Sequence, residues 1–238
     1  MIKRTRIKIC GLTRSIDVQA AVSAGADALG FVFYPPSPRY IRPEIAASLL
    51  CDIPPFVTKV GLFVNEDAGR VREIIATTSI DLLQFHGDEE PAYCRQFGRP
   101  WIKAARVRAE LDLVEYAARF LDEFQDDGSA KRCQVSGRAS GILLDAYVDE
   151  YGGGGKTFDW NLIPSVLPMP VILSGGLTVQ NVFSAVTAVR PWAVDVSSGV
   201  EASRMTETGL VAIKGIKDAQ KIVEFIAGVR DADARCKL

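Results

Sequence analysis

The chain has 238 residues, with 28 Lys and Arg against 29 Asp and Glu, so its formal net charge is -1. Hydrophobic residues make up 48% and charged residues 24%, a composition that excludes a disordered or fibrous chain. Because no basic excess is available to neutralise phosphates, we expect no nucleic-acid partner.

The longest uncharged stretch, residues 160–189, is long enough to cross a bilayer. Its three prolines and a Gly-Gly pair would break a spanning helix, so we expect a buried strand and a turn, and no membrane partner. The basic first ten residues precede no long apolar run and predict no secretory signal. Five cysteines without a C-x-x-C motif, and a single histidine, favour a reducing cytoplasm and predict no metal site.

The first half of the chain alternates short apolar runs, typical of buried strands, with helical segments. The predicted strands are 7–12, 28–33, 59–64, 81–87 and 101–107, and the predicted helices are 15–24, 43–51, 67–76, 89–97 and about 110–124. Ser15 is the expected N-cap of the first helix and Gly25 its expected C-cap, while Pro43 opens the second helix. Three prolines make residues 34–40 a loop.

The second half continues the alternation after a polar segment. Residues 125–140 carry both charge signs and are predicted to form a surface insertion. Strands are predicted at 141–146, 170–176 and 193–199, and helices at 178–189 and 214–229, with a short helical candidate at 158–163.

About eight strand–helix units imply a parallel sheet and an α/β protein. Eight such units close into a (β/α)8 TIM barrel, which we expect to form a single domain over residues 1–238. A doubly wound open sheet is the alternative, but no G-x-G-x-x-G follows the first strand.

Two glycine turns follow the predicted seventh and eighth strands, where this fold usually binds phosphate. Glycine lets backbone N–H groups converge on an anion, although each turn alone is also a common tight turn. The predicted phosphate-binding residues are Gly175, Gly176, Ser197, Ser198 and Gly199.

Other side chains at strand ends carry two interpretations each. Cys10 is a small buried residue, or a thiolate that acts as base or nucleophile, for which a thiol pKa of about 8.5 leaves only a small reactive fraction at neutral pH. Asp145 is a cap or ion-pair partner, or an acid held protonated by its surroundings, and Asp195 has the same two interpretations. His86 is structural or binds substrate, and Arg39 is solvated or binds a carboxylate.

The glycine run in residues 151–157 is a flexible linker or a mobile loop that closes over a ligand. Its spacing does not match a Walker A motif.

Taken together, these motifs resemble the phosphoribosylanthranilate isomerase family of tryptophan biosynthesis. The resemblance runs from the first strand to the last helix, and its motifs lie at residues 8–13, 30–33, 37–41, 60–65, 83–87, 143–146, 152–160, 173–181, 195–201 and 217–218.

The resemblance implies the Amadori rearrangement of N-(5-phosphoribosyl)anthranilate to 1-(2-carboxyphenylamino)-1-deoxyribulose 5-phosphate by general acid–base catalysis. It implies that Asp145 is the general acid and Cys10 the general base, that Arg39 holds the anthranilate carboxylate, and that Asp195 lies near the anthranilate nitrogen. The backbone of the two glycine turns would hold the phosphate. The partner is then a small phosphosugar, with no metal or redox cofactor, and the assembly is a monomer or homodimer.

Four features depart from the family's usual pattern, one of them the insertion at residues 125–140, which lengthens the connection before Asp145, and three other functions remain as alternatives. The family usually has Gly-Gly-Thr-Gly where this chain has four glycines at 152–155, and Phe85 and Ser174 replace a common leucine and alanine. The first alternative is a barrel isomerase of histidine biosynthesis, or a dual-substrate isomerase, but these enzymes typically have an aspartate in place of Cys10. A lyase resembling indole-glycerol-phosphate synthase needs a strand-end lysine, whereas Lys8 and Lys103 lie within strands. The third rival is a phosphosugar-binding pseudoenzyme.

Overall fold

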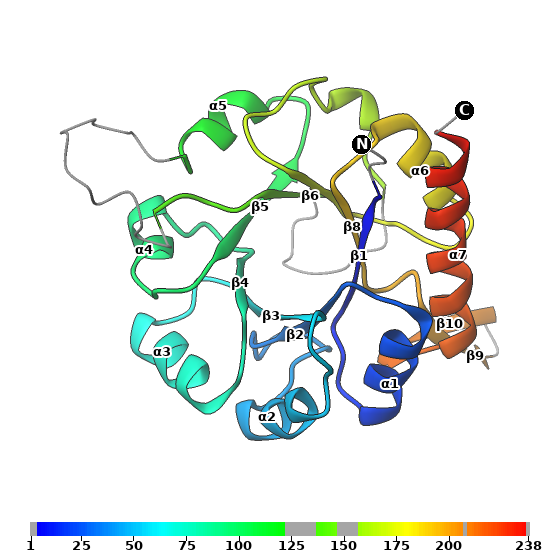
Figure 1. The fold of residues 1–238 in the computed structure, drawn as a ribbon, viewed down its shortest axis with the longest axis horizontal. Coiled ribbons are helices and arrows are strands. Elements are labelled where there is room, and N and C mark those ends of the chain that lie inside the picture. The colour runs from blue at the N-terminus through cyan, green and yellow to red at the C-terminus, as the bar shows by residue number, and fades with distance from the viewer. Residues whose placement is uncertain (1–3, 122–136, 147–156, 207–208, 237–238) are drawn as a thin grey trace.

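Eight parallel strands form a closed ring at the centre of the molecule, with helices around it (Figure 1). The computed structural model describes residues 4–121, 137–146, 157–206 and 209–236. The barrel strands are β1 (Arg6–Cys10), β2 (Ala28–Val32), β3 (Thr58–Phe63), β4 (Leu82–Phe85), β5 (Trp101–Val107), β6 (Ile142–Ala146), β7 (Val171–Leu173) and β8 (Ala193–Val196). Each strand pairs with the next and β8 pairs with β1, which confirms the predicted (β/α)8 barrel.

The helices follow the strands in the alternation that the sequence predicts. They are α1 (Ser15–Ala24), α2 (Pro43–Cys51), α3 (Ala68–Thr77), α4 (Pro91–Arg95), α5 (Leu113–Ala118), the 3-10 helix η1 (Trp160–Leu162), α6 (Val182–Val189) and α7 (Ala219–Arg235). Gly25 ends α1 in a left-handed conformation, φ 90°, as expected of a glycine C-cap.

The strict alternation of side chains along each strand separates two hydrophobic layers. One face of the strands packs against the helices in the main core, which includes Ile7, Phe31 and Trp101. The other face fills the barrel, with Ile102, Ala104, Leu143, Ile172 and Ala193 near the N-terminal ends of the strands, and Cys10, Val32, Leu62 and Val64 near their C-terminal ends.

Residues two apart on a strand share a face, so this alternation also places the polar residues. Asp145 lies two residues after Leu143, and Asp195 lies two residues after Ala193, so both aspartates are on the inner face of the barrel. The same rule places Gln84 and His86 above Leu82. The barrel interior therefore carries its polar groups toward the C-terminal ends of the strands.

The structure corrects several predicted boundaries. Arg14 precedes α1 without a side-chain cap, so Ser15 is the first helical residue and not the N-cap. Helix α5 spans only Leu113–Ala118 within the predicted 110–124, and α6 begins at Val182, after a turn closed by the Asn181 side chain. The predicted insertion at 125–140 lies mostly outside the described residues.

The largest correction lies between β8 and α7. The predicted helix at 214–229 begins only at Ala219, where the Asp218 side chain accepts hydrogen bonds from the amides of Gln220 and Lys221. Before it, β9 (Glu201–Thr206) and β10 (Gly209–Lys217) form an antiparallel two-stranded sheet beside the barrel (Figure 1).

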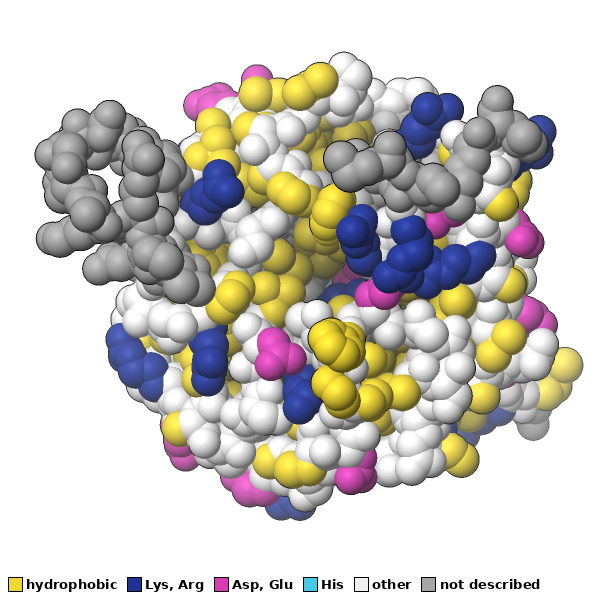
Figure 2. All heavy atoms as spheres, in the orientation of Figure 1, with side chains coloured by type: hydrophobic (Ala, Val, Ile, Leu, Met, Phe, Trp, Pro, Cys, Tyr) yellow, Lys and Arg dark blue, Asp and Glu magenta, His cyan; other side chains and the backbone are white. Residues whose placement is uncertain are grey.

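In the described part of the chain, no helix is both long and apolar enough to cross a membrane. The uncharged stretch at 160–189 instead contains η1, β7 and α6. On the face drawn in Figure 2, basic, acidic and hydrophobic side chains are all present.

Candidate active site

Cys10 is the last residue of β1 and is buried, with 4% of its surface exposed. Its neighbour on the same face, Lys8, forms an ion pair with Asp195 on β8, with Lys8 Nζ 2.9 Å from Asp195 Oδ1. Burial raises the pKa of the Cys10 thiol, the Lys8 ammonium lowers it and the Asp195 carboxylate raises it, so that the pKa lies above its ordinary value. The Cys10 thiol is thus buried beside two charged side chains, at the C-terminal end of the barrel strands.

Asp145 lies near the end of β6 and is held by two hydrogen bonds. His86 Nε2 is 3.0 Å from Asp145 Oδ2, and the Ala146 amide donates to Oδ1 at 2.9 Å. Gln84 continues the chain of contacts, with its Nε2 3.0 Å from His86 Nδ1. His86 therefore lies beside the predicted acid, and the two side chains are only partly buried.

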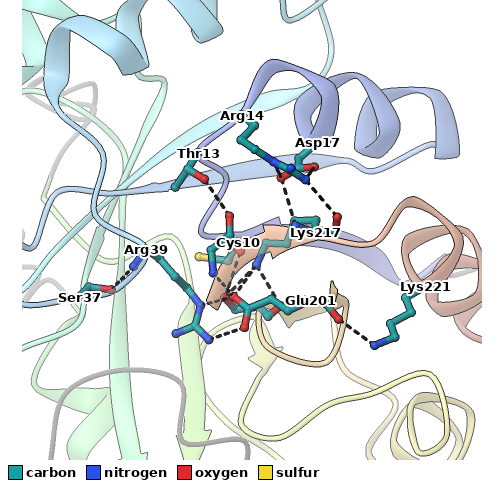
Figure 3. A network of polar contacts seen from close by, with 11 residues as sticks. Cys10, Thr13, Arg14, Asp17, Ser37, Arg39, Glu201, Lys217 and Lys221 are labelled. Carbon is teal, nitrogen blue, oxygen red and sulfur yellow. Dashed lines mark hydrogen bonds and ion pairs between the residues drawn. The ribbon is translucent and has the colours of Figure 1, made fainter. Parts of the chain in front are cut away.

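Arg39, in the loop after β2, directs its guanidinium fork at Glu201 of β9 (Figure 3). Arg39 Nε and Nη2 donate to Glu201 Oε1 and Oε2 at 2.7 and 3.0 Å. Glu201 also accepts from the Gly215 amide and from Lys217 Nζ. Despite burial, the hydrogen bond from Arg39 and the charge of Lys217 hold the pKa of Glu201 below its ordinary value.

Lys217 brings a further cation to this cluster, from the last residue of β10. Its Nζ donates to the Ser197 carbonyl at 3.0 Å, and the Ser197 hydroxyl donates to the Cys10 carbonyl at 3.1 Å. Burial lowers the pKa of Lys217, the Glu201 charge raises it, and the result lies below the ordinary value. The cluster therefore joins β1, the loop after β2, the turn after β8 and the β9–β10 sheet.

The two predicted phosphate turns lie side by side, joined by a parallel bridge between Thr178 and Gly199. Gly175 and Gly176 both adopt positive φ, 78° and 65°. A β-carbon on Gly175 would lie 2.5 Å from the Ala146 amide nitrogen, and one on Gly199 would lie 1.9 Å from the Leu177 carbonyl oxygen. The glycines are therefore required for these turns to approach each other and β6.

All ten predicted site residues lie at or beyond the C-terminal halves of the strands, the end at which barrels of this kind bind their substrates. Sequence reasoning missed the roles of Lys8, Gln84, Glu201 and Lys217. The sequence places Lys8 inside a strand, where it does not meet the requirement of a lyase for a strand-end lysine. Glu201 and Lys217 lie in motifs of the family resemblance, but the resemblance assigns them no role. Residues 151–156 of the glycine run at 151–157 lie outside the described residues.

Within the described ranges, no three His, Cys, Asp or Glu side chains cluster as metal ligands would. The side chains and turns that the structure does place at this end of the barrel can transfer protons and bind anions. A thiol and a carboxyl, on strands separated by β7 and β8, face the same mouth, with two basic side chains and two amide-rich turns around them.

Comparison with known proteins agrees with this chemistry. A family model described as N-(5'phosphoribosyl)anthranilate (PRA) isomerase matches residues 7–228. The N-(5'-phosphoribosyl)anthranilate isomerase of Dechloromonas aromatica (strain RCB) is 58% identical over 230 residues, covering 97% of this chain and 98% of that protein.

Two solved structures are similar over 95% of this chain and 99% of their own. Phosphoribosyl anthranilate isomerase from Thermotoga maritima has a TM-score of 0.76 and 39% identity. A phosphoribosyl anthranilate isomerase in complex with reduced 1-(o-carboxyphenylamino)-1-deoxyribulose 5-phosphate has a TM-score of 0.71 and 35% identity.

Proposed function

The chain belongs to the N-(5'-phosphoribosyl)anthranilate isomerase family, and we propose that Cys10 and Asp145 are the general base and general acid of its isomerisation. The reaction is the Amadori rearrangement of tryptophan biosynthesis, an aldose-to-ketose shift. It needs one acid and one base on different sides of the sugar. Strands β1 and β6, separated in the barrel by β7 and β8, provide that arrangement.

The first step opens the furanose ring. Asp145 donates a proton to the ring oxygen, the bond from that oxygen to C1 breaks, and the anthranilate nitrogen forms a protonated Schiff base with C1. The Ala146 amide donates to Asp145 Oδ1, and His86 Nε2 lies beside Oδ2. We assign to His86, whose Nε2 lies 3.0 Å from Asp145 Oδ2, the orientation of this carboxyl group toward the ring oxygen.

Gln84 supports this assignment. Its Oε1 is buried and has no hydrogen-bond partner among the described residues, while its Nε2 faces His86 Nδ1. Because the two ends of an amide are assigned from their contacts, turning the group over places Oε1 on Nδ1. Gln84 then accepts from Nδ1–H and holds the His86 ring in place beside Asp145.

The second step removes the proton from C2. The Cys10 thiolate takes this proton, and the C–H electron pair forms a C1–C2 double bond while the Schiff-base nitrogen becomes neutral. The resulting enolamine tautomerises to the ketone. Positioned acids and bases of this kind each contribute about 10²–10⁴-fold to rate.

The remaining predicted residues orient the substrate. Arg39 uses two of its five N–H donors on Glu201, and the others would meet the anthranilate carboxylate. Asp195, whose Oδ1 takes the Lys8 hydrogen bond, would accept from the anthranilate nitrogen. The amides at Gly175, Gly176, Ser197, Ser198 and Gly199 would bind the phosphate.

The observation that carries this proposal is the placement of Cys10 and a His86-bound Asp145 at the ends of β1 and β6. The experiment is turnover of freshly prepared phosphoribosylanthranilate by the purified chain, followed as loss of substrate fluorescence, with the product identified by mass and by NMR. Formation of the carboxyphenylamino-deoxyribulose phosphate supports the proposal. Binding of product without turnover would favour the pseudoenzyme instead.

Three further predictions accompany this function. We propose that the protein acts in a reducing cytoplasm, and the free thiols Cys10, Cys51, Cys94 and Cys236 in the described part of the chain are consistent with that proposal. A single domain over residues 1–238 and a monomeric or homodimeric state also remain predictions. Sedimentation of the purified chain distinguishes the two states.

A further inference from the structure

We propose that Lys8 is a positioning residue that favours formation of the Cys10 thiolate during the reaction, with its own ammonium group anchored by Asp195. This inference rests on the proposed role of Cys10 as general base. It gives a function to Lys8, the partner of Asp195 to which the reaction scheme assigns no role.

Strand geometry places the three groups together. Lys8 and Cys10 are two residues apart on β1, so their side chains point to the same face of the sheet, inside the barrel. Lys8 lies opposite Asp195 of β8 in the register, and Cys10 lies opposite Gly30 of β2. The ion pair is therefore fixed directly beneath the thiol.

Gly30 provides the space in which the thiol and the ammonium meet. A β-carbon at this position would lie 2.7 Å from Cys10 Sγ and 3.1 Å from Lys8 Nζ. The two side-chain ends thus share the volume that a larger residue would fill.

The charges around Cys10 explain why the nearby Lys8 ammonium affects the thiol. Burial raises the pKa of Cys10, Asp195 on β8 raises it too, and the cations Lys8 and Lys217, on β1 and β10, lower it. Burial also opposes the charge on Lys8, but Asp195 and Cys10 outweigh it and raise the pKa of Lys8 above its ordinary value. Lys8 therefore stays charged and offsets part of the effect of burial on Cys10, whose pKa still lies above its ordinary value.

The first test compares Lys8→Met and Lys8→Arg with the wild type. Thiolate absorbance near 240 nm is titrated with pH, and subtraction of a matched Cys10→Ser protein isolates the signal of Cys10. Lys8→Met should move this titration to higher pH. Its kcat/KM at pH 7 should fall about tenfold for each unit of that displacement, and the loss should shrink as the pH rises. Lys8→Arg keeps the charge and should recover most of both properties.

A second variant covers the case in which Lys8→Met fails to fold because Asp195 loses its partner. Gly30→Ala keeps every charge but places a methyl group against both Sγ and Nζ. Gly61→Ala is its control, since the new β-carbon there lies 2.7 Å from Ile80 Cδ1 and touches no charged group. Gly30→Ala should move the Cys10 titration to higher pH, and Gly61→Ala should not.

The inference is overturned if the Cys10 titration stays in place in Gly30→Ala and in folded Lys8→Met. It is also overturned if Lys8→Met loses activity equally at every pH and Lys8→Arg recovers none of it, since Lys8 would then be only structural. A wild type that does not turn over phosphoribosylanthranilate would refute the proposed function instead, and the titration would still report the Lys8 contact.

Discussion

Replacing Glu201 with glutamine should destabilise the protein far more than a surface substitution of the same kind. Glu201 is 1% exposed and accepts hydrogen bonds from Arg39, Lys217 and the Gly215 amide. Glutamine removes the negative charge and turns an N–H₂ group toward cationic donors. Arg39 and Lys217 are then left as buried cations without a counter-ion.

The magnitude follows from burial. Breaking one partner of a buried ion pair costs about 3–5 kcal/mol, because the remaining charge stays in the interior. For a chain of this size each kcal/mol lowers the melting temperature by about 2–4 °C, so we expect a decrease of about 6–20 °C. An exposed ion pair contributes only about 0–1 kcal/mol.

Urea and thermal unfolding of Glu201→Gln and Glu73→Gln measure this difference. The exposed pair Arg70–Glu73 has the same shortest N–O distance as Arg39–Glu201, 2.7 Å, so the two substitutions differ in burial and in the number of donors that the carboxylate accepts from. Adding Arg39→Met to Glu201→Gln removes one unpaired cation and should restore part of the loss. A Glu201→Gln protein that loses no more stability than Glu73→Gln would refute the reasoning.

The effect also depends on pH with a definite sign. The folded-state pKa of Glu201 is lowered by Arg39 and Lys217 in spite of burial. Its ionised form therefore contributes fully above the unfolded glutamate pKa of about 4.3, and this contribution is lost as the pH falls through the lower folded value. The stability gap between wild type and Glu201→Gln should narrow below about pH 4.

Other substitutions test separate parts of the account. Gly199→Ala brings a β-carbon to 1.9 Å from the Leu177 carbonyl oxygen and should raise KM at least about tenfold through the phosphate turn, while Gly98→Ala, in open space, should leave KM unchanged. Asp233→Ala removes the acceptor of the Thr5 amide and hydroxyl and should cost about 1–3 kcal/mol in urea unfolding; an unchanged midpoint would contradict this. Dialysis against EDTA should leave turnover unchanged, and a loss would contradict acid–base catalysis without metal.

The barrel was predictable because its strands are short apolar runs whose order along the chain is also their order in space. The β9–β10 sheet was not, because residues 214–217 were assigned to the following helix. Two signals mark the true boundary. Asp218 is an N-cap residue type, and its side chain caps α7, while Gly209 and Gly215 adopt positive φ at 117° and 80°.

Positions of site residues were predictable where strand ends fix them, as for Cys10 and Asp145. Their partners were not, since each pairing joins residues far apart in sequence. Arg39 meets Glu201 across 162 positions, and His86 meets Asp145 across 59. Sequence periodicity shows which residues share a strand face, but the barrel's closure decides which strands face each other.

Lys8 illustrates this limit. As a charged residue in the middle of an apolar strand, it contradicts the buried pattern around it, and this conflict is itself a signal of a partner. Its partner, Asp195, stands in the middle of another apolar strand. The closing pair of strands, β1 and β8, brings the two together.

The most direct test of the central claim is the turnover of Cys10→Ala and Asp145→Asn beside the wild type, with product affinity measured on the same samples. Cys94→Ala, which alters another buried free thiol, is the control. We expect kcat to fall by about 10²-fold or more in each site variant. Product affinity and the Cys94→Ala rate should stay near wild type. Wild-type kcat in either site variant would contradict the assignment of base and acid.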